Sequence, residues 1–560
     1  MGLYKRIKAE HILYIITILL LFIFLVYPLG KIIGQAFLYN GNLSLKSIQS
    51  MWIVESNQEA MLRSLNVSVW STLFSLLLGV ALAWIVTRTD LPYKNRLKSM
   101  LLAPFLIPPF VGAIAWVQLL GPAGYINKLL MNILPRSEPL FNIYGPIGII
   151  TVMSLHSYPT AFLVACAAFE KMDSSLEEAA LMSGGTKRDI IKDITLPIMM
   201  PSILGVALIT FAQCITNFGV PAVLGMPARY LVFTTKIYEQ INSFGNVNNF
   251  SFAAALSVQL IAISLTALLF QKLYLGKKQY TVITGKSTQP QVLDMGKLKY
   301  GFAGFIILIF VITTVAPITA IILSSLNKAV GLAPAPMNWT LNNYEYVLLK
   351  SQTTIRAIKN SLFLGIISAT GATLLGGIVS YFSVKSKIRG RQTVEFIGSA
   401  AQAVPGTVLG LGMILAWIKP VGGITIYNTI WIIAVAYIAH YISLSIRTTS
   451  ASFYQIHDSL EEAARMSGAT WLETIRDIVF PMIRSGLIAS WMLVFMPSLR
   501  ELTISILLWS SGNETIGVSV FNLSEGGQSQ YASAMGVVLI IIVFMGNLAV
   551  KKATRNKYGF

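Results

Sequence analysis

Charged side chains are scarce in this sequence. Only 12% of the 560 residues are Asp, Glu, Lys or Arg, while 55% are hydrophobic. A soluble globular domain carries about a quarter of its residues as charges. So few charges cannot cover a water-facing surface, which argues against a soluble enzyme or binding domain. The mean hydropathy of +0.68 favours a chain whose solvent is the lipid bilayer.

Cysteine is nearly absent as well. The two cysteines, Cys166 and Cys214, lie in apolar runs, which argues against a disulfide framework and favours two small buried hydrophobes.

No cluster of residues has metal-ligand spacing. The sequence Gly-Lys-Ser at 285–287 lacks the glycine that a phosphate-binding loop needs five residues earlier, where Tyr280 stands. We therefore expect no metal site, catalytic residue, bound cofactor or ATP site in this chain.

Long hydrophobic runs, by contrast, are abundant. A helix needs about 20 apolar residues to cross a bilayer. The first such run ends without a signal-peptidase site, so we expect this helix to be retained. The runs predict an all-α polytopic membrane protein with twelve spans, namely Ile12–Leu29, Val67–Val86, Met100–Leu120, Ile147–Phe169, Ile203–Leu224, Phe250–Phe270, Phe302–Leu323, Ser361–Val384, Val394–Ile418, Ile424–Ile446, Leu487–Leu508 and Ala532–Val550.

Lys and Arg are distributed unevenly between alternate loops. With the basic residues 5–8 in the cytoplasm, the basic clusters at 88–98, 385–391 and 551–557 fall on the same side of the membrane. The excess of positive charge on cytoplasmic loops then predicts that both termini are cytoplasmic. The net charge of +19 is therefore interpreted as contact with anionic membrane lipid, not with nucleic acid.

One segment of the sequence occurs twice. Residues 176–197 read LEEAALMSGGTKRDIIKDITLP and residues 460–481 read LEEAARMSGATWLETIRDIVFP, with 13 of 22 positions identical at an offset of 284. Two further pairs correspond at an offset of 297: Gly79 with Gly376, and Pro108 with Pro405. We infer two six-helix repeats that enter the membrane in the same direction, related by a pseudo-twofold axis along the membrane normal.

Each copy of the repeated segment falls in a predicted cytoplasmic loop between the fourth and fifth spans of its half. Helix-forming residues, a glycine bend and a second short helix predict a compact knob. Such a knob either caps the helix bundle or docks in a groove of a cytoplasmic partner. The near identity of two copies in otherwise divergent halves favours docking on two identical partners.

The repeated segment resembles the signature of type I permeases of binding-protein-dependent ABC importers. In that signature Glu-Ala-Ala is followed, after three residues, by Gly and, after nine more, by Ile-x-Leu-Pro. Phe480 replaces the leucine in the second copy. The residues that match and are expected to couple to an ATPase are Glu178, Ala179, Ala180, Gly184 and Pro197 in the first copy, and Glu462, Ala463, Ala464, Gly468 and Pro481 in the second.

The resemblance implies that each knob is a coupling helix seated on one of two copies of a separate cytoplasmic ATPase. That partner would bind ATP and Mg, so the chain itself is not expected to be an enzyme. An extracytoplasmic substrate-binding protein would deliver the solute, and the location would be the cell membrane of a prokaryote. Glu178 and Glu462 are expected to make charge-assisted contacts with the ATPase, and Gly184 and Gly468 to shape the turn.

The resemblance also suggests a domain organisation and a cargo. We expect an N-terminal helix and external loop (1–60), a first ABC transmembrane domain (61–275), a cytoplasmic linker (276–300), a seventh helix and external loop (301–355), a second transmembrane domain (356–552) and a tail (553–560). The stretches 217–225 and 498–523 look most like the ferric-iron branch of fused double permeases. Ferric iron is therefore the expected cargo, and thiamine, phosphonate, polyamine or another small solute is the alternative.

Polar residues inside predicted spans are candidates for a translocation pathway, because burial in lipid makes them costly. Arg500 and Glu501 lie mid-way along the eleventh run, where Glu501 corresponds to Asn217, and His156 corresponds to His440 at the same offset of 284. Because neighbours on a helix lie about 100° apart, we expect one of Arg500 and Glu501 to face the pathway and the other to pair with a neighbouring helix. The alternatives are an internal salt bridge for this pair and interhelical hydrogen bonds for the histidines.

A twelve-helix protein in two halves is also compatible with an ion-coupled secondary transporter. Such a transporter would carry several carboxylates inside the membrane as proton relays. Glu501 is the one carboxylate placed in mid-span by the sequence. The scarcity of membrane carboxylates and the paired knobs favour the importer.

Overall fold

The computed structural model describes residues 2–134, 137–172, 175–243, 248–277, 292–420 and 422–553. Within these ranges eleven helices are long and apolar enough to cross a membrane, or twelve if one pair bent by 113° counts as a single span. The predicted all-α membrane fold is thus confirmed. The motif at 285–287, most of the linker and nearly all of the tail lie outside the described residues.

The first half contains helices α1 to α14, whose bounds are α1 Gly2–Leu21, α2 Tyr27–Ala36, α3 Lys46–Ile53, α4 Glu55–Arg88, α5 Lys94–Leu102, α6 Pro109–Leu120, α7 Tyr125–Ile133, α8 Pro146–Glu170, α9 Ser175–Met182, α10 Lys187–Ile190, α11 Leu196–Ile215, α12 Gly219–Gly225, α13 Phe233–Asn242 and α14 Asn249–Lys277. Strands β1 (Leu38–Tyr39) and β2 (Asn42–Leu43) form a small antiparallel hairpin. Its turn is Asn40-Gly41, and both residues have positive φ, as a tight hairpin turn of this type requires.

The second half contains helices α15 to α27, whose bounds are α15 Leu298–Phe310, α16 Ala316–Leu326, α17 Asn342–Glu345, α18 Gln352–Val384, α19 Arg391–Ala400, α20 Gly406–Trp417, α21 Ile430–Phe453, α22 Asp458–Met466, α23 Trp471–Thr474, α24 Phe480–Leu499, α25 Ser505–Leu508, α26 Ile516–Glu525 and α27 Ser529–Ala553. The 3-10 helices η2 (Ala103–Leu106) and η8 (Ala401–Ala403) hold equivalent places in the two halves.

The helix bounds reproduce the sequence repeat. The starts of α4 and α18, of α5 and α19, and of α6 and α20 are each 297 residues apart, while those of α8 and α21, α10 and α23, and α11 and α24 are each 284 apart. The packing repeats too, because α4 lies along α8 and α11 as α18 lies along α21 and α24. The change of offset falls between α6 and α8, where the first half contains α7.

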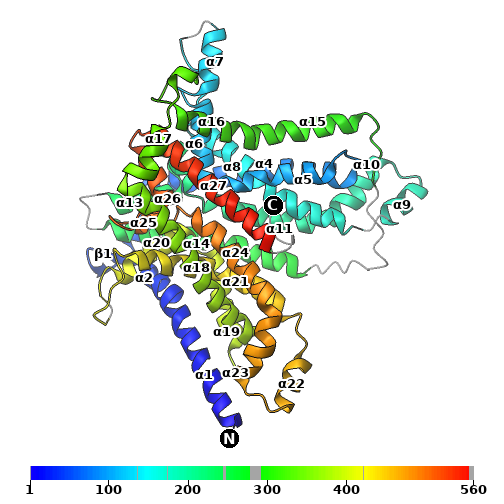
Figure 1. Cartoon of the computed structure of the whole chain (residues 1–560), viewed down its shortest axis with the longest axis vertical. Helices are drawn as coiled ribbons and strands as arrows, with labels where there is room; N and C mark the ends of the chain where they lie inside the picture. The colour runs from blue at the N-terminus through cyan, green and yellow to red at the C-terminus, as the bar shows by residue number, and fades with distance from the viewer. Residues whose placement is uncertain are drawn as a thin grey trace.

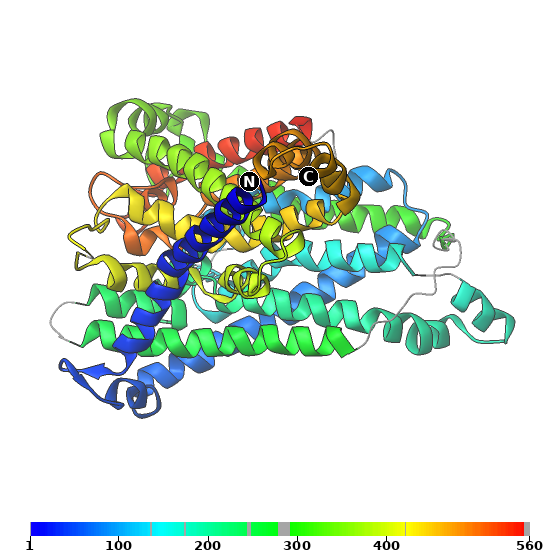
Figure 2. The ribbon, with the colours of Figure 1, turned by 90° about the horizontal axis from the view of Figure 1, so that it is seen from below.

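The first helix of each half packs against the other half. Helix α1 contacts α18 and α19, and α2 contacts α20, while α15 contacts α5 and α16 contacts α6. Figure 2 shows α1, in dark blue, crossing the second-half helices. Gly412 of α20 leaves so little room that a Cβ there would lie 2.9 Å from Ile32 Cδ1. This exchange interlocks the two halves.

Two of the predicted spans are broken, and two are shifted toward the N-terminus, to Arg188–Ile215 and Trp471–Leu499. The predicted helices Met100–Leu120 and Val394–Ile418 each break before Pro108 or Pro405, because a proline disfavours helical geometry in the residue before it. The predicted spans Ile203–Leu224 and Leu487–Leu508 stop at Ile215 and Leu499, and the chain then forms the short helices α12 and α25. Arg500 and Glu501 therefore lie beyond the end of α24, and the prediction that they are mid-helix was wrong.

Four prolines inside long helices share one local structure. Each follows a π-helical turn by two residues, and the turns are Phe22–Val26 before Pro28, Ile191–Thr195 (η3) before Pro197, Val311–Val315 before Pro317, and Ile475–Val479 (η9) before Pro481. Proline has no N–H and its ring clashes with the carbonyl of the previous helical turn. The wider π turn accommodates both defects, so the helix continues through the proline.

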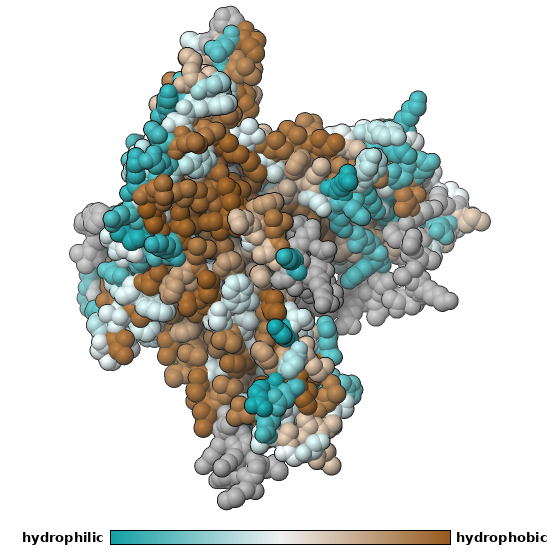
Figure 3. Space-filling model, viewed as in Figure 1, coloured by the Kyte–Doolittle hydropathy of each residue, from teal (hydrophilic) through white to brown (hydrophobic). Residues whose placement is uncertain are grey.

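The surface is apolar along the helices and hydrophilic at their ends. Figure 3 shows hydrophobic side chains over α16 and α27 and hydrophilic ones around α22. Large apolar side chains such as Ile15 (62% exposed) and Leu77 (60%) face outward along the spans. In a membrane these faces contact lipid, which explains why so much apolar surface is left uncovered.

Candidate functional site

One polar cavity of about 450 Å³ lies between the two halves. All five residues predicted for the pathway line it: Asn217, His156, His440, Arg500 and Glu501. The first half contributes α6, α8, α11 and α14, and the second half contributes α20, α21 and α24. Arg447 of α21 also lines the cavity, and sequence reasoning missed it because it lies near the end of a long apolar helix.

Glu501 and Asn217 perform the same structural task in the two halves. The Glu501 carboxylate accepts hydrogen bonds from the backbone N–H groups of Ile504 (2.8 Å) and Ser505 (3.1 Å). The Asn217 side-chain oxygen accepts one from the N–H of Val220 at 3.1 Å. Both therefore cap the short helix that follows the break, where backbone N–H groups have no partner within the helix.

Arg500 is held by the opposite half. Its Nη1 donates a hydrogen bond to the carbonyl oxygen of Phe105 in η2 at 2.5 Å. No ion pair between Arg500 and Glu501 occurs among those formed by the described residues. Both residues line the same cavity because they lie in a helix break, and Arg500 also bonds to the neighbouring element η2, so which of the two faces a pathway stays a prediction.

Two helices begin at the cavity wall. Helices α6 and α20, each of 12 residues, start at Pro109 and Gly406 directly after the prolines that break the third and ninth spans. Pro109, Phe110, Pro405 and Gly406 all line the cavity. The first N–H groups of a helix lack intrahelical partners and carry partial positive charge. Both repeats therefore direct the positive end of a helix toward the same space.

The two repeated segments fold as predicted into knobs at the far ends of the bundle, the first made of α9 and α10 and the second of α22 and α23 (Figure 1). Gly184 and Gly468 end the first helix of each knob with φ of +86° and +85°, a conformation that favours glycine. Glu178 and Glu462 are exposed. At the tips, Met182 and Met466 are 89% and 90% exposed and occupy equivalent positions.

The remaining signature residues lie behind the tips. Ala179 and Ala463 are exposed, Ala180 is half-buried and Ala464 is buried. Pro197 and Pro481 lie in the first turns of α11 and α24. These two helices are candidate membrane spans, and each follows its knob directly in the chain.

A buried ion pair fastens the first knob to the bundle. Arg88 at the end of α4 donates to both carboxylate oxygens of Glu177, at 3.0 and 3.2 Å, and Thr195 donates to the same carboxylate at 2.9 Å. The side chains of Arg88 and Glu177 are only 4% and 11% exposed. Sequence reasoning chose Glu178 and missed Glu177, because two adjacent glutamates give no signal of which one faces inward.

The second knob is fastened by a different pair. Lys385, which stands 297 residues after Arg88, donates to Asp458 at 2.5 Å and to the carbonyl oxygen of Ile456 at 2.6 Å. Lys385 is 4% exposed but Asp458 is 80% exposed. The hydrogen bond from Lys385 holds the pKa of Asp458 below its ordinary value. Each knob is thus tied to the end of the equivalent helix of its own half, the first to α4 through a buried carboxylate and the second to α18 through a solvated one.

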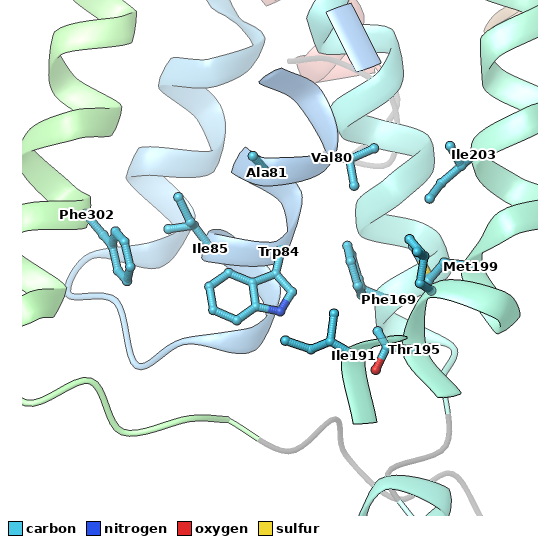
Figure 4. A pocket seen from close by; sticks show the side chains of 11 residues that line it. Val80, Ala81, Trp84, Ile85, Phe169, Ile191, Thr195, Met199, Ile203 and Phe302 are labelled. Carbon is cyan, nitrogen blue, oxygen red and sulfur yellow. The ribbon is translucent and has the colours of Figure 1, made fainter. Parts of the chain in front are cut away.

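An apolar groove of about 300 Å³ runs beside the first knob. Figure 4 shows Trp84 and Ile85 of α4 on one side, with Ile191, Thr195 and Met199 of η3 and α11 on the other. The lining is apolar except for Thr195, whose hydroxyl is already bonded to Glu177. A charged solute would find no partner there, so the polar cavity between the halves is the better candidate for a solute site.

Comparison with known families matches two separate regions of the chain. The family of binding-protein-dependent transport system inner membrane components matches residues 67–279 and 362–555. The chain belongs to this family. The two matched regions include the knobs and the cavity-lining helices, and they leave the exchanged first helix of each half outside.

Relatives match either the whole permease or one half of it. The ferric transport system permease protein of Actinobacillus pleuropneumoniae is 27% identical over 94% of this chain and 75% of its own length. The Fe(3+)-transport system permease protein of Haemophilus influenzae is 26% identical over 87% of this chain and 88% of its own. The molybdenum transport system permease protein of Escherichia coli is 28% identical over 38% of this chain but 93% of its own, so one half here corresponds to a whole protein there.

Family membership fixes the general role of the chain. It is the multi-pass inner-membrane permease of a binding-protein-dependent ABC importer, whose ATP hydrolysis belongs to a separate subunit. The assignment implies an ATPase and a periplasmic binding protein as partners. It also decides against the ion-coupled secondary transporter.

Proposed function

We propose that this permease imports ferric iron and that the solute crosses through the cavity between the two halves. Each knob contacts one of two copies of a cytoplasmic ATPase, and both chain termini lie in the cytoplasm. The observation that carries the proposal is the pairing of two equivalent exposed knobs with a central polar cavity that α11 and α24 connect to them. A force applied to the knobs reaches the cavity through α11 and α24, which run from the knobs to Asn217 and Arg500.

The tips of the knobs have the chemistry of a docking surface. Each presents an exposed methionine, Met182 or Met466, beside an exposed carboxylate, Glu178 or Glu462. Methionine is flexible and polarisable and fits apolar grooves of varied shape, while the carboxylate can pair with a basic side chain of the partner. Exposed methionines at the same place in two diverged halves support a common partner surface.

A second polar cavity, of about 400 Å³, lies further along α6 and α12. Gln118 and Tyr144 line it with Glu525, at the end of α6 away from the central cavity. Partial burial raises the pKa of Glu525 above its ordinary value, and the Glu525 charge adds to the effect of burial in raising the pKa of Tyr144. We assign this cavity to the side on which the binding protein releases its solute.

Two of the relatives that match nearly the whole chain support iron as the cargo, because these two are described as ferric transport permeases. Thiamine, phosphonate or polyamine remains the alternative cargo of the same kind of importer. The decisive experiment is to purify the permease with its ATPase and binding protein and to identify the ligand that the binding protein retains. We expect two ATPase copies per chain and bound ferric iron. A binding protein that retains another solute and releases no iron would reject iron as the cargo.

A further inference from the structure

The charges that line the central cavity are mainly positive. Arg447 and Arg500 both line it, and Glu501 is the single carboxylate among the described residues that do so. The other titratable groups on the wall are His156, His440 and Tyr441. Neither arginine takes part in an ion pair formed by the described residues. The cavity therefore holds two guanidinium groups, and no carboxylate in the described part of the chain forms an ion pair with either.

The one carboxylate is poorly placed to bind a cation. Both oxygens of Glu501 accept backbone hydrogen bonds, from Ile504 and Ser505, which hold the carboxylate against the start of α25. These bonds occupy one acceptor site on each oxygen and share the carboxylate charge with the start of α25. By contrast, Arg500 uses one of its N–H donors on Phe105, and its remaining donors are available.

The backbone adds to the positive field. Helices α6 and α20 both begin at the cavity wall, so the positive ends of two helix dipoles lie beside the same space, although Pro109 at the start of α6 has no N–H. Helix N-termini bind anions because these N–H groups are unpaired and the helix dipole is positive there. The side-chain amides of Gln213 and Gln402 supply further donors on the wall.

We propose that the solute enters this cavity with anionic oxygen groups on its surface, either as a free oxyanion or as a metal ion enclosed by oxyanion or carboxylate ligands. This inference rests on the proposed function, in that the cavity is the pathway. A bare ferric ion carries three positive charges and would be repelled by both arginines and by both helix ends. Ferric iron coordinated by phosphate or citrate presents oxygen acceptors to those same groups.

The test uses the permease with its ATPase and binding protein in liposomes. One arm supplies ⁵⁵Fe(III) with [³²P]phosphate or [¹⁴C]citrate, a second supplies the labelled anion without iron, and a third supplies ⁵⁵Fe(III) in perchlorate, a weak ligand. We expect the labelled anion to enter with iron at one or more per iron atom if the solute is a complex. We expect it to enter without iron if the solute is a free oxyanion. Iron that enters equally fast in perchlorate, without the labelled anion, would overturn the proposal.

A binding measurement separates this inference from the identity of the cargo. Equilibrium dialysis of the purified complex against [³²P]phosphate should detect binding that Arg447→Gln weakens by roughly 10- to 100-fold, the loss expected for a charged hydrogen bond. The matched control is Arg63→Gln, because Arg63 lies outside the cavity and pairs with Glu59. Arg500→Lys keeps the charge and should retain most of the binding.

The outcomes of the two experiments are distinct. If phosphate binds in the cavity but the binding protein retains no iron, ferric iron is rejected as the cargo and the proposal that the cavity binds anionic groups stands. If iron is transported but phosphate does not bind, or if Arg447→Gln leaves phosphate binding unchanged, iron stands as the cargo and the proposal that the cavity binds anionic groups is rejected.

Discussion

The buried pair between Arg88 and Glu177 offers the sharpest quantitative prediction. Both side chains are nearly inaccessible to water, and the guanidinium reaches both carboxylate oxygens. Removing one partner of a buried pair leaves an uncompensated charge and costs about 3–5 kcal/mol. Arg88→Met should therefore shift the local equilibrium toward a detached first knob by roughly 150- to 5,000-fold.

Hydrogen exchange measures this detachment directly. With the permease in lipid nanodiscs, amides of α9 should exchange roughly 150- to 5,000-fold faster in Arg88→Met, the range expected for the loss of a buried pair. The double variant Arg88→Met with Glu177→Leu removes both charges and should recover most of the protection. A change below about threefold in the single variant, or no recovery in the double variant, would refute the reasoning.

The second half supplies the matched control. Lys385→Met also removes a buried cation, but its partner Asp458 is 80% exposed and remains solvated when the pair is broken. Pairs with a solvated partner contribute little, so exchange in α22 should rise by less than about fivefold. If exchange rose equally in α9 of Arg88→Met and in α22 of Lys385→Met, the burial assigned to the Arg88–Glu177 and Lys385–Asp458 pairs would be contradicted.

Three further outcomes follow from the same structure. Replacing Met182 and Met466 together by Ser should weaken co-purification of the ATPase at least tenfold while leaving membrane insertion unchanged, and unchanged co-purification would contradict docking at the tips. Gly184→Ala forces a side chain into a backbone with φ of +86°, which should cost about 1 kcal/mol locally and reduce coupled ATP hydrolysis in a rate assay. Gly79→Ala should lower the yield of folded protein in size-exclusion chromatography, because its Cβ would lie 2.7 Å from Ala161 Cβ and overpacking costs about 1–3 kcal/mol. Gly30→Ala, with nothing within 4 Å of the added Cβ, is the control.

The repeat, the number of spans and the knobs could be predicted from the sequence because each depends on local composition or on self-similarity. Helix-forming residues predict α9, and the glycine that follows them predicts the turn. In the structure α9 spans Ser175–Met182 and Gly184 has a positive φ. The equivalence of Asn217 and Glu501 also followed from the constant offset of 284. The structure gave that equivalence a physical cause, since both side chains cap the helix after the break.

The helix breaks could be predicted only in part. In the first half, Gly219 and Pro221 follow Asn217 closely and signal an interruption. In the second half the run from Leu487 to Leu508 contains Pro497 but no glycine. Apolar length alone predicts one continuous span in each half, so the break is missed in both halves. The consequence was the wrong placement of Arg500 and Glu501 on a continuous helix.

Contacts between distant elements could not be predicted. The Arg88–Glu177 pair joins residues 89 apart and depends on which of two adjacent glutamates faces the bundle. Arg447 reaches the cavity because of how α21 packs beside α24, which no local pattern reports. The exchange of the first helices between halves likewise depends on packing and not on composition.

Cross-linking from the knob tips tests the central claim most directly. The two native cysteines, Cys166 and Cys214, are buried, so a cysteine introduced by Met182→Cys or Met466→Cys is the accessible one. We predict that each variant cross-links to one ATPase copy and that the double variant captures two, whereas Met337→Cys, an exposed position beyond the far end of α16, captures none. An ATPase that cross-links from Met337→Cys, or from neither knob, would contradict the account.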